Sequence, residues 1–157
     1  MAAAKLIAAV VAAAGLSPLT AAPVPKLEGA AAELKLLEGT WEVESVTLGG
    51  RAFPKSEPPV RYEYKGSLIT VTRTKGMWSL EVDPTATPKR MTQTQVELTD
   101  GKPVPLAGGQ VNQVVYELKG DKLTMVVWRG PKPEFPKSVT PEPGDPVLVT
   151  VLKRVKN

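Results

Sequence analysis

From Thr40 onward the chain is divided into short segments in which apolar and polar residues alternate with a period of two. Such alternation places successive side chains on opposite faces of an extended strand, so it predicts β-structure rather than helix. Glycine and proline separate the segments, and the chain holds 13 glycines and 16 prolines in its 157 residues. This succession of short segments is typical of a single all-β barrel or sandwich.

Eight segments carry the alternation, and each ends at a turn signal. They comprise residues 40–48, 61–65, 68–73, 77–82, 88–98, 111–118, 122–128 and 147–154. Lys119-Gly-Asp121 predicts a tight hairpin between two of them. The last segment is apolar on both faces, which indicates a strand buried on both sides. Residues 51–60, 99–109 and 131–146 are rich in proline or glycine, and we expect all three to form loops.

The first 21 residues have the composition of a cleaved signal peptide. Lys5 precedes an apolar run of about eleven residues, and small residues follow it, so we place the cleavage site after Ala21. A helix that spans a bilayer needs roughly 20 apolar residues, so this run is too short to remain as an anchor. We therefore predict a secreted or periplasmic protein without a stable membrane span after signal cleavage.

Residues 22–36 are expected to form a linker and a short helix, ahead of a barrel domain at residues 37–157. Ala30 to Leu37 is rich in residues that favour helix, although two turns are too few to be stable alone. Leu34 and Leu37 are three residues apart, so they share one helix face and are expected to pack on the domain that follows.

Cysteine and histidine are both absent from the chain. Their absence excludes disulfides, thiolate nucleophiles, zinc sites built from these residues and the Ser-His-Asp relay. The acidic residues lack the spacing of a calcium loop. We therefore predict no catalytic site, no metal and no cofactor.

The net charge of +4 is small, and acidic residues interleave with the basic ones near the C-terminus. A surface that binds nucleic acid needs a denser basic stripe with aromatic residues for stacking. We therefore predict no nucleic-acid partner.

Four stretches in this order resemble a known family. They are Leu37–Val46, which contains Gly39-Thr-Trp41, then Leu80–Thr85 with Pro88-Lys89, Val115–Leu123 and Val147–Arg154. The chain is similar to small secreted lipocalin-like domains of unknown function that are abundant in planctomycete bacteria. The resemblance implies a single eight-stranded antiparallel β-barrel with a short N-terminal helix, and it brings no known activity. An open sandwich is the alternative architecture.

The resemblance also implies how the barrel closes. In lipocalin-like barrels a tryptophan of the first strand lies beneath a late arginine at the closed end, and Trp41 and Arg154 occupy these places. We expect a cation–π contact between them. The segment from Phe135 to Pro146 is longer and richer in proline than the family pattern. If it lies at the barrel mouth, it would control entry in a way special to this protein.

A set of aromatic and apolar side chains is expected to point into the barrel. It comprises Tyr62, Tyr64, Trp78, Tyr116 and Met125, together with Leu123 and Val127. Eight strands enclose an interior that side chains can just fill or that can hold one small ligand, so both interpretations stay open. Glu42 and Glu44 lie on one strand face and share one environment, which favours a solvated surface over an acid–base pair.

Two functions follow from these patterns. The first is a non-catalytic secreted binding module, either for a small apolar ligand in the barrel or for a protein partner on its surface. The alternative is a structural or accessory envelope protein with a filled barrel and no ligand. A cavity bounded by Tyr64, Trp78 and Tyr116 would favour the small ligand, whereas an exposed apolar patch would favour the protein partner.

Overall fold

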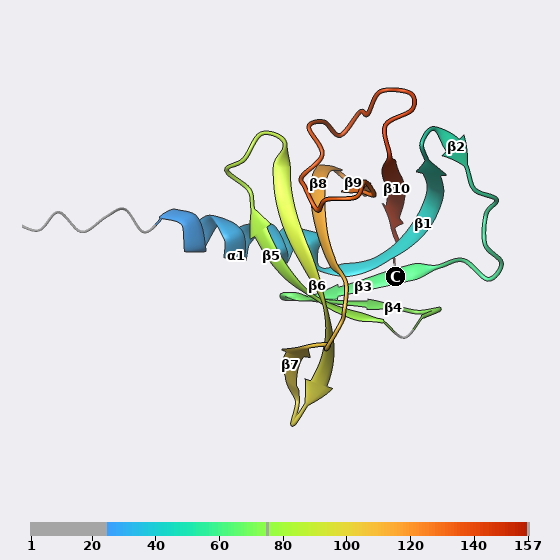
Figure 1. Cartoon of the computed structure of the whole chain (residues 1–157). Helices are drawn as coiled ribbons and strands as arrows, with labels where there is room; N and C mark the ends of the chain where they lie inside the picture. The colour runs from blue at the N-terminus through green and yellow to red at the C-terminus, as the bar shows by residue number, and fades with distance from the viewer. Residues whose placement is uncertain (1–24, 75, 157) are drawn as a thin grey trace, which may run out of the picture.

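The computed structural model describes residues 25–74 and 76–156 (Figure 1). The predicted signal peptide, residues 1–21, lies outside the described residues. Within them, one helix precedes ten strands. These are α1 (Pro25–Leu37), β1 (Gly39–Leu48), β2 (Arg51–Ala52), β3 (Arg61–Lys65), β4 (Leu68–Val71), β5 (Met77–Asp83), β6 (Lys89–Thr99), β7 (Lys102–Pro105), β8 (Val111–Lys119), β9 (Lys122–Trp128) and β10 (Val147–Arg154).

Eight of the strands form a closed antiparallel barrel. Neighbours pair in the order β1-β3-β4-β5-β6-β8-β9-β10, and β10 pairs with β1 to complete the circle. The closing register joins Trp41 to Arg154 at one end and Leu48 to Leu148 at the other. The predicted eight-stranded antiparallel barrel with a short N-terminal helix is confirmed, and the open sandwich is wrong.

Two short strands lie outside this circle, in segments that we predicted as loops. β2 pairs with the end of β1, and β7 pairs with the end of β6 to form a hairpin that projects beyond the barrel (Figure 1). The hairpin turns through Asp100 and Gly101, with φ of 53° and 73°. Two successive positive φ values are the mark of the tight turn that matches the natural twist of a hairpin. The prediction of a loop at residues 102–105 was wrong, because Pro103 and Pro105 interrupt the pattern by which a strand is recognised in the sequence.

One end of the barrel is covered by α1. Leu37 is fully buried and Leu34 packs against the barrel core, as the shared helix face predicts. The helix begins at Pro25, earlier than the expected start at Ala30. Proline suits the first helical position because its φ angle is already helical and the amide it lacks would have no partner there. The long connections 49–60, 100–110 and 129–146 all leave from the opposite end of the barrel.

The proline-rich connection between β9 and β10 packs on the outside of the barrel. Phe135 and Val139 lie against the outward-facing Val115, Val126 and Val147, which form a second apolar cluster apart from the barrel core. This explains why β10 is apolar on both faces. Although the segment starts and ends at the mouth, it covers the outer face of β8 to β10, which argues against the control of entry that we considered for it.

Candidate functional site

Arg154 and Trp41 meet at the end of the barrel that α1 covers. The guanidinium carbon of Arg154 lies 4.1 Å from the centroid of the Trp41 ring, so the expected cation–π contact is present. The same guanidinium donates hydrogen bonds to the carbonyls of Glu38 and, at 2.7 Å, Leu36. The Trp41 indole donates to the carbonyl of Leu37 at 2.8 Å. These contacts fasten the end of α1 to the closing seam of the barrel, which is a structural role.

The predicted ligand-lining residues lie in the barrel core and contact one another. Tyr64 and Tyr116 are 2% and 1% exposed, Met125 is also buried, and Tyr62 and Trp78 are half-buried at the edge of the same cluster. The Tyr64 hydroxyl reaches the Met125 sulfur at 3.3 Å across the barrel. Leu123 and Val127 belong to this cluster as well.

Burial raises the pKa of the Tyr64 hydroxyl, and it raises that of Tyr62 in spite of the opposing charge of Arg129. The Gln93 amide nitrogen points at the sulfurs of Met91 and Met125, at 3.5 and 3.8 Å. Side chains from β3, β6 and β9 thus meet in the interior. This packing favours a filled barrel, and the ligand-lining role of Tyr62, Tyr64, Trp78, Tyr116 and Met125 stays a prediction.

A buried carboxylate that sequence reasoning missed lies where α1 meets the barrel. Glu33 is 5% exposed, and both of its carboxylate oxygens accept hydrogen bonds from Lys89 at 2.8 Å. Tyr116 donates to the same carboxylate at 3.2 Å. Burial raises the pKa of Tyr116, and the charge and hydrogen bond of Glu33 raise it further. Glu33, Lys89 and Tyr116 together fix α1 against β6 and β8. The burial of Glu33 was not predicted, because nothing in the sequence distinguishes it from an exposed glutamate on a short helix.

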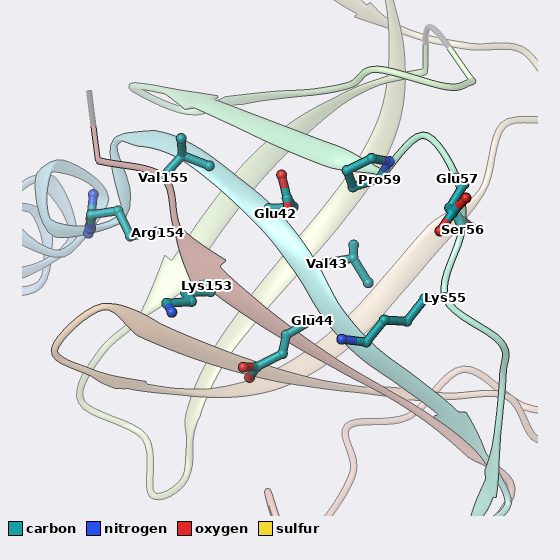
Figure 2. A pocket seen from close by; sticks show the side chains of 10 residues that line it. All are labelled: Glu42, Val43, Glu44, Lys55, Ser56, Glu57, Pro59, Lys153, Arg154 and Val155. Carbon is teal, nitrogen blue, oxygen red and sulfur yellow. The ribbon is translucent and has the colours of Figure 1, made fainter.

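A groove runs along β1, between this strand and the connection from β2 to β3 (Figure 2). It has a volume of about 540 Å³. Its lining combines β1, the connection between β2 and β3, and the end of β10. The lining residues are Glu42, Val43, Glu44, Lys55, Ser56, Glu57, Pro59, Lys153, Arg154 and Val155.

The groove exists because β1 changes partners along its length. β3 pairs with β1 only as far as Glu42, and β2 pairs with it only at Thr47 and Leu48. A register shift between Val43 and Ser45 interrupts the pairing with β10 at the same place. The connection 53–60 spans the interval, held by hydrogen bonds from Val43 to Val60 at 3.0 Å and from Phe53 to Val46 at 2.9 Å. Between these two bonds the connection stands away from β1.

A smaller apolar slot adjoins the groove. Its volume is about 140 Å³, and its apolar walls are Val43, Val46, Phe53, Pro54, Pro59, Val60 and Tyr62. Val43, Glu44, Lys55, Ser56 and Pro59 line both hollows, so the slot and the groove form one continuous depression. Phe53 is 51% exposed at its edge. We use "groove" and "slot" below for these two parts.

Most of the acidic groups of the groove are already paired. Arg61 donates two hydrogen bonds to Glu42, both at 3.0 Å, and Lys122 lies 3.8 Å from Glu44. The two glutamates therefore lie on an exposed, ion-paired face. Among residues 25–74 and 76–156, Lys55 and Lys153 form no ion pair within 4.0 Å.

No protein-family model, curated protein or solved structure matches the chain. In the described part of the chain, no helix is long and apolar enough to cross a membrane. No three acidic side chains gather there as metal ligands. The interpretation of the site therefore depends on its geometry and charge.

Proposed function

We propose that this protein is a non-catalytic secreted binding module whose site is the groove and slot beside β1. The observation that carries the proposal is the apolar slot, which has Lys55 on its lining and opens into a groove that also contains Lys153. Neither lysine forms an ion pair within 4.0 Å among the described residues. Apolar walls with a few polar groups at the rim are the usual form of a binding site. Secretion is inferred from the composition of residues 1–21, and membership of the lipocalin-like family from the four stretches described above.

The contact between Tyr64 and Met125 across the interior is the reason that we propose a site beside β1 rather than at the centre of the barrel. Tyr64 and Met125 are in contact across the interior, and a ligand there would have to displace them. The slot needs no such displacement, because Phe53 and Ser56 at its rim are already exposed.

A structural or accessory protein without a ligand is the second candidate. The packing of Tyr64 on Met125 favours it, because a filled core needs no cargo to be stable. The two candidates differ in what they expect of the surface. Only the binding module gives the slot and the exposed Phe53 a role.

A nuclear magnetic resonance titration with benzyl alcohol tests the proposal, because its ring is of the size that a slot of about 140 Å³ accepts. We expect saturable shifts of the backbone amides of residues 43–46 and of the non-proline residues in 53–60. Ser56→Trp should abolish them by filling the groove from its exposed wall. Ser67→Trp, at an exposed turn beside the helix-covered end, is the matched control and should leave them intact. Shifts centred on Tyr64 and Met125, or none at all, would contradict the proposal.

A further inference from the structure

We infer that the groove receives an extended acidic segment of a partner protein, which inserts one bulky apolar side chain into the slot. This inference rests on the proposed function and names the partner chemistry of the same site. Three observations carry it: the size of the slot, the charges along the groove, and the apolar residues that stay exposed beside it.

The slot has room for one side chain and not for a long lipid chain. Its volume of about 140 Å³ is close to that of a cavity known to hold benzene, about 150 Å³. Drug-sized ligands need roughly 300–1,000 Å³, a volume that the groove provides and the slot alone does not. Three walls of the slot, Val43, Val60 and Tyr62, pack against the barrel core, so the slot lies directly over the core. A phenylalanine or leucine side chain therefore fits this slot better than an acyl chain does.

The charges left over in the groove favour an acidic occupant. Arg61 and Lys122 already face Glu42 and Glu44, whereas Lys55 and Lys153 have no ion pair among the described residues. The two lysines come from different walls: Lys55 extends from the connection toward β1, and Lys153 lies on β10 opposite Glu42 (Figure 2).

Two further charged groups complete the lining. Arg154 is held over Trp41, and Glu57, on the outer wall, is the acid of the lining that forms no ion pair among the described residues. The lining holds three acidic and three basic side chains, and their ion-pair partners add Arg61, Lys122, Lys156 and Asp121, so the groove and its surroundings carry an excess of two positive charges. Carboxylates on both sides of an apolar anchor would complement it.

Exposed apolar residues beside the slot indicate an occupant larger than a single small molecule. Phe53 is 51% exposed at the slot, and Leu48, two residues beyond Val46 on β1, is 39% exposed. A peptide that runs from the groove across the slot and on toward the β2 end of β1 would cover Phe53 and then Leu48. Together with an anchor side chain, such contacts have the form of a protein interface, in which a buried apolar centre is surrounded by polar groups.

Fluorescence anisotropy with labelled peptides tests this inference. The probe is Gly-Asp-Phe-Asp-Gly, and the two controls replace both Asp residues by Asn or the Phe by Ala. We expect the probe to bind most tightly, with about fivefold weaker binding after loss of the carboxylates. Loss of the phenyl group should weaken binding by about tenfold or more, because the apolar burial is removed.

Charge reversal in the protein provides the matched test. The double variant Lys55→Glu, Lys153→Glu should lose the acidic probe and prefer Gly-Lys-Phe-Lys-Gly. Lys102→Glu, Lys132→Glu changes the net charge equally at exposed sites away from the groove and should behave as the unaltered protein. Thermal unfolding followed by circular dichroism checks that both variants are folded.

The outcomes separate the inference from the proposed function. Equal binding of all three peptides, or binding that survives the Lys55→Glu, Lys153→Glu reversal, would overturn the inference. If benzyl alcohol shifts the groove amides and the acidic probe does not bind, the inference fails and the binding module stands. If neither probe binds, both fail.

Discussion

Arg154 shows how a single side chain holds several parts of this protein together. It covers the Trp41 ring, donates to two carbonyls at the end of α1 and lies 3.8 Å from Asp121. Gly39 makes this approach possible. Its φ of 118° suits glycine alone, and a Cβ at this position would lie 3.1 Å from the Arg154 guanidinium. The glycine and the tryptophan of the Gly39-Thr-Trp41 motif are thus both explained by their contacts with Arg154.

Arg154→Ala should lower the free energy of unfolding by about 2–4 kcal/mol, because it removes the cation–π contact and two charge-assisted hydrogen bonds to carbonyls. Urea denaturation followed by circular dichroism measures this change. Lys153→Ala, at an exposed neighbouring position on the same strand, is the control and should change the stability by less than about 0.5 kcal/mol. Equal stability losses in the two variants would remove the structural role that we assign to Arg154.

The sequence allows some of these residue contacts to be predicted and not others. The contact between Trp41 and Arg154 was predicted from the resemblance, because the tryptophan lies in the first strand of the barrel and the arginine in the last. Glu33 could not be identified in this way. Its burial depends on where α1 meets Lys89 and Tyr116, which lie 56 and 83 residues further along the chain.

The hairpin of β6 and β7 is the element most exposed to unwanted pairing. β7 has a neighbour on one side only, so its outer edge could receive another strand. The amide of Leu106 donates to Gln95 on the β6 side, and the hairpin register places Val104 in the same orientation. Pro103 and Pro105 alternate with these positions and so face the outer edge, where they provide no N–H donor.

Replacing both prolines, Pro103→Thr with Pro105→Thr, should restore two edge donors and cause self-association that increases with protein concentration. Analytical ultracentrifugation measures it. Val104→Thr is the matched control, since it changes the same strand without adding a donor to the edge. A double variant that stays in the same association state as the control would show that the prolines do not protect this edge.

The alternation of apolar and polar residues predicts most strands because it is a local property of the chain. It located the eight barrel strands to within a few residues, and Gly120 marked the β8–β9 hairpin. The groove could not be predicted in the same way. It arises where β3 stops at Glu42 and residues 53–60 stand away from β1, and the register shift that accompanies it leaves no pattern in the sequence.

All three tyrosines of the chain lie in the barrel. Burial raises the pKa of Tyr62, Tyr64 and Tyr116 above the ordinary value of 10.0. Above pH 10 the unfolded chain therefore releases phenol protons that the folded chain retains. Because the unfolded state then binds fewer protons, stability is fully present below pH 10 and falls as the pH rises beyond it.

We therefore expect phenolate absorbance to appear together with the loss of β-structure in an alkaline titration. Absorbance near 295 nm and far-ultraviolet circular dichroism, recorded on the same samples, measure the two events. Phenolate formation at about pH 10 in a protein that keeps its circular dichroism spectrum would mean that the tyrosines are open to solvent. That result would also contradict the filled interior.

We propose that this barrel binds through the groove and slot beside β1 and not through the centre of its interior. Nuclear Overhauser effects between a bound Gly-Asp-Phe-Asp-Gly peptide and the side chains of the isotope-labelled protein test it most directly. We predict contacts from the phenyl ring to the methyl groups of Val43, Val46 and Val60. Contacts from that ring to the Met125 methyl group and the Tyr64 ring would place the ligand inside the barrel and contradict the claim.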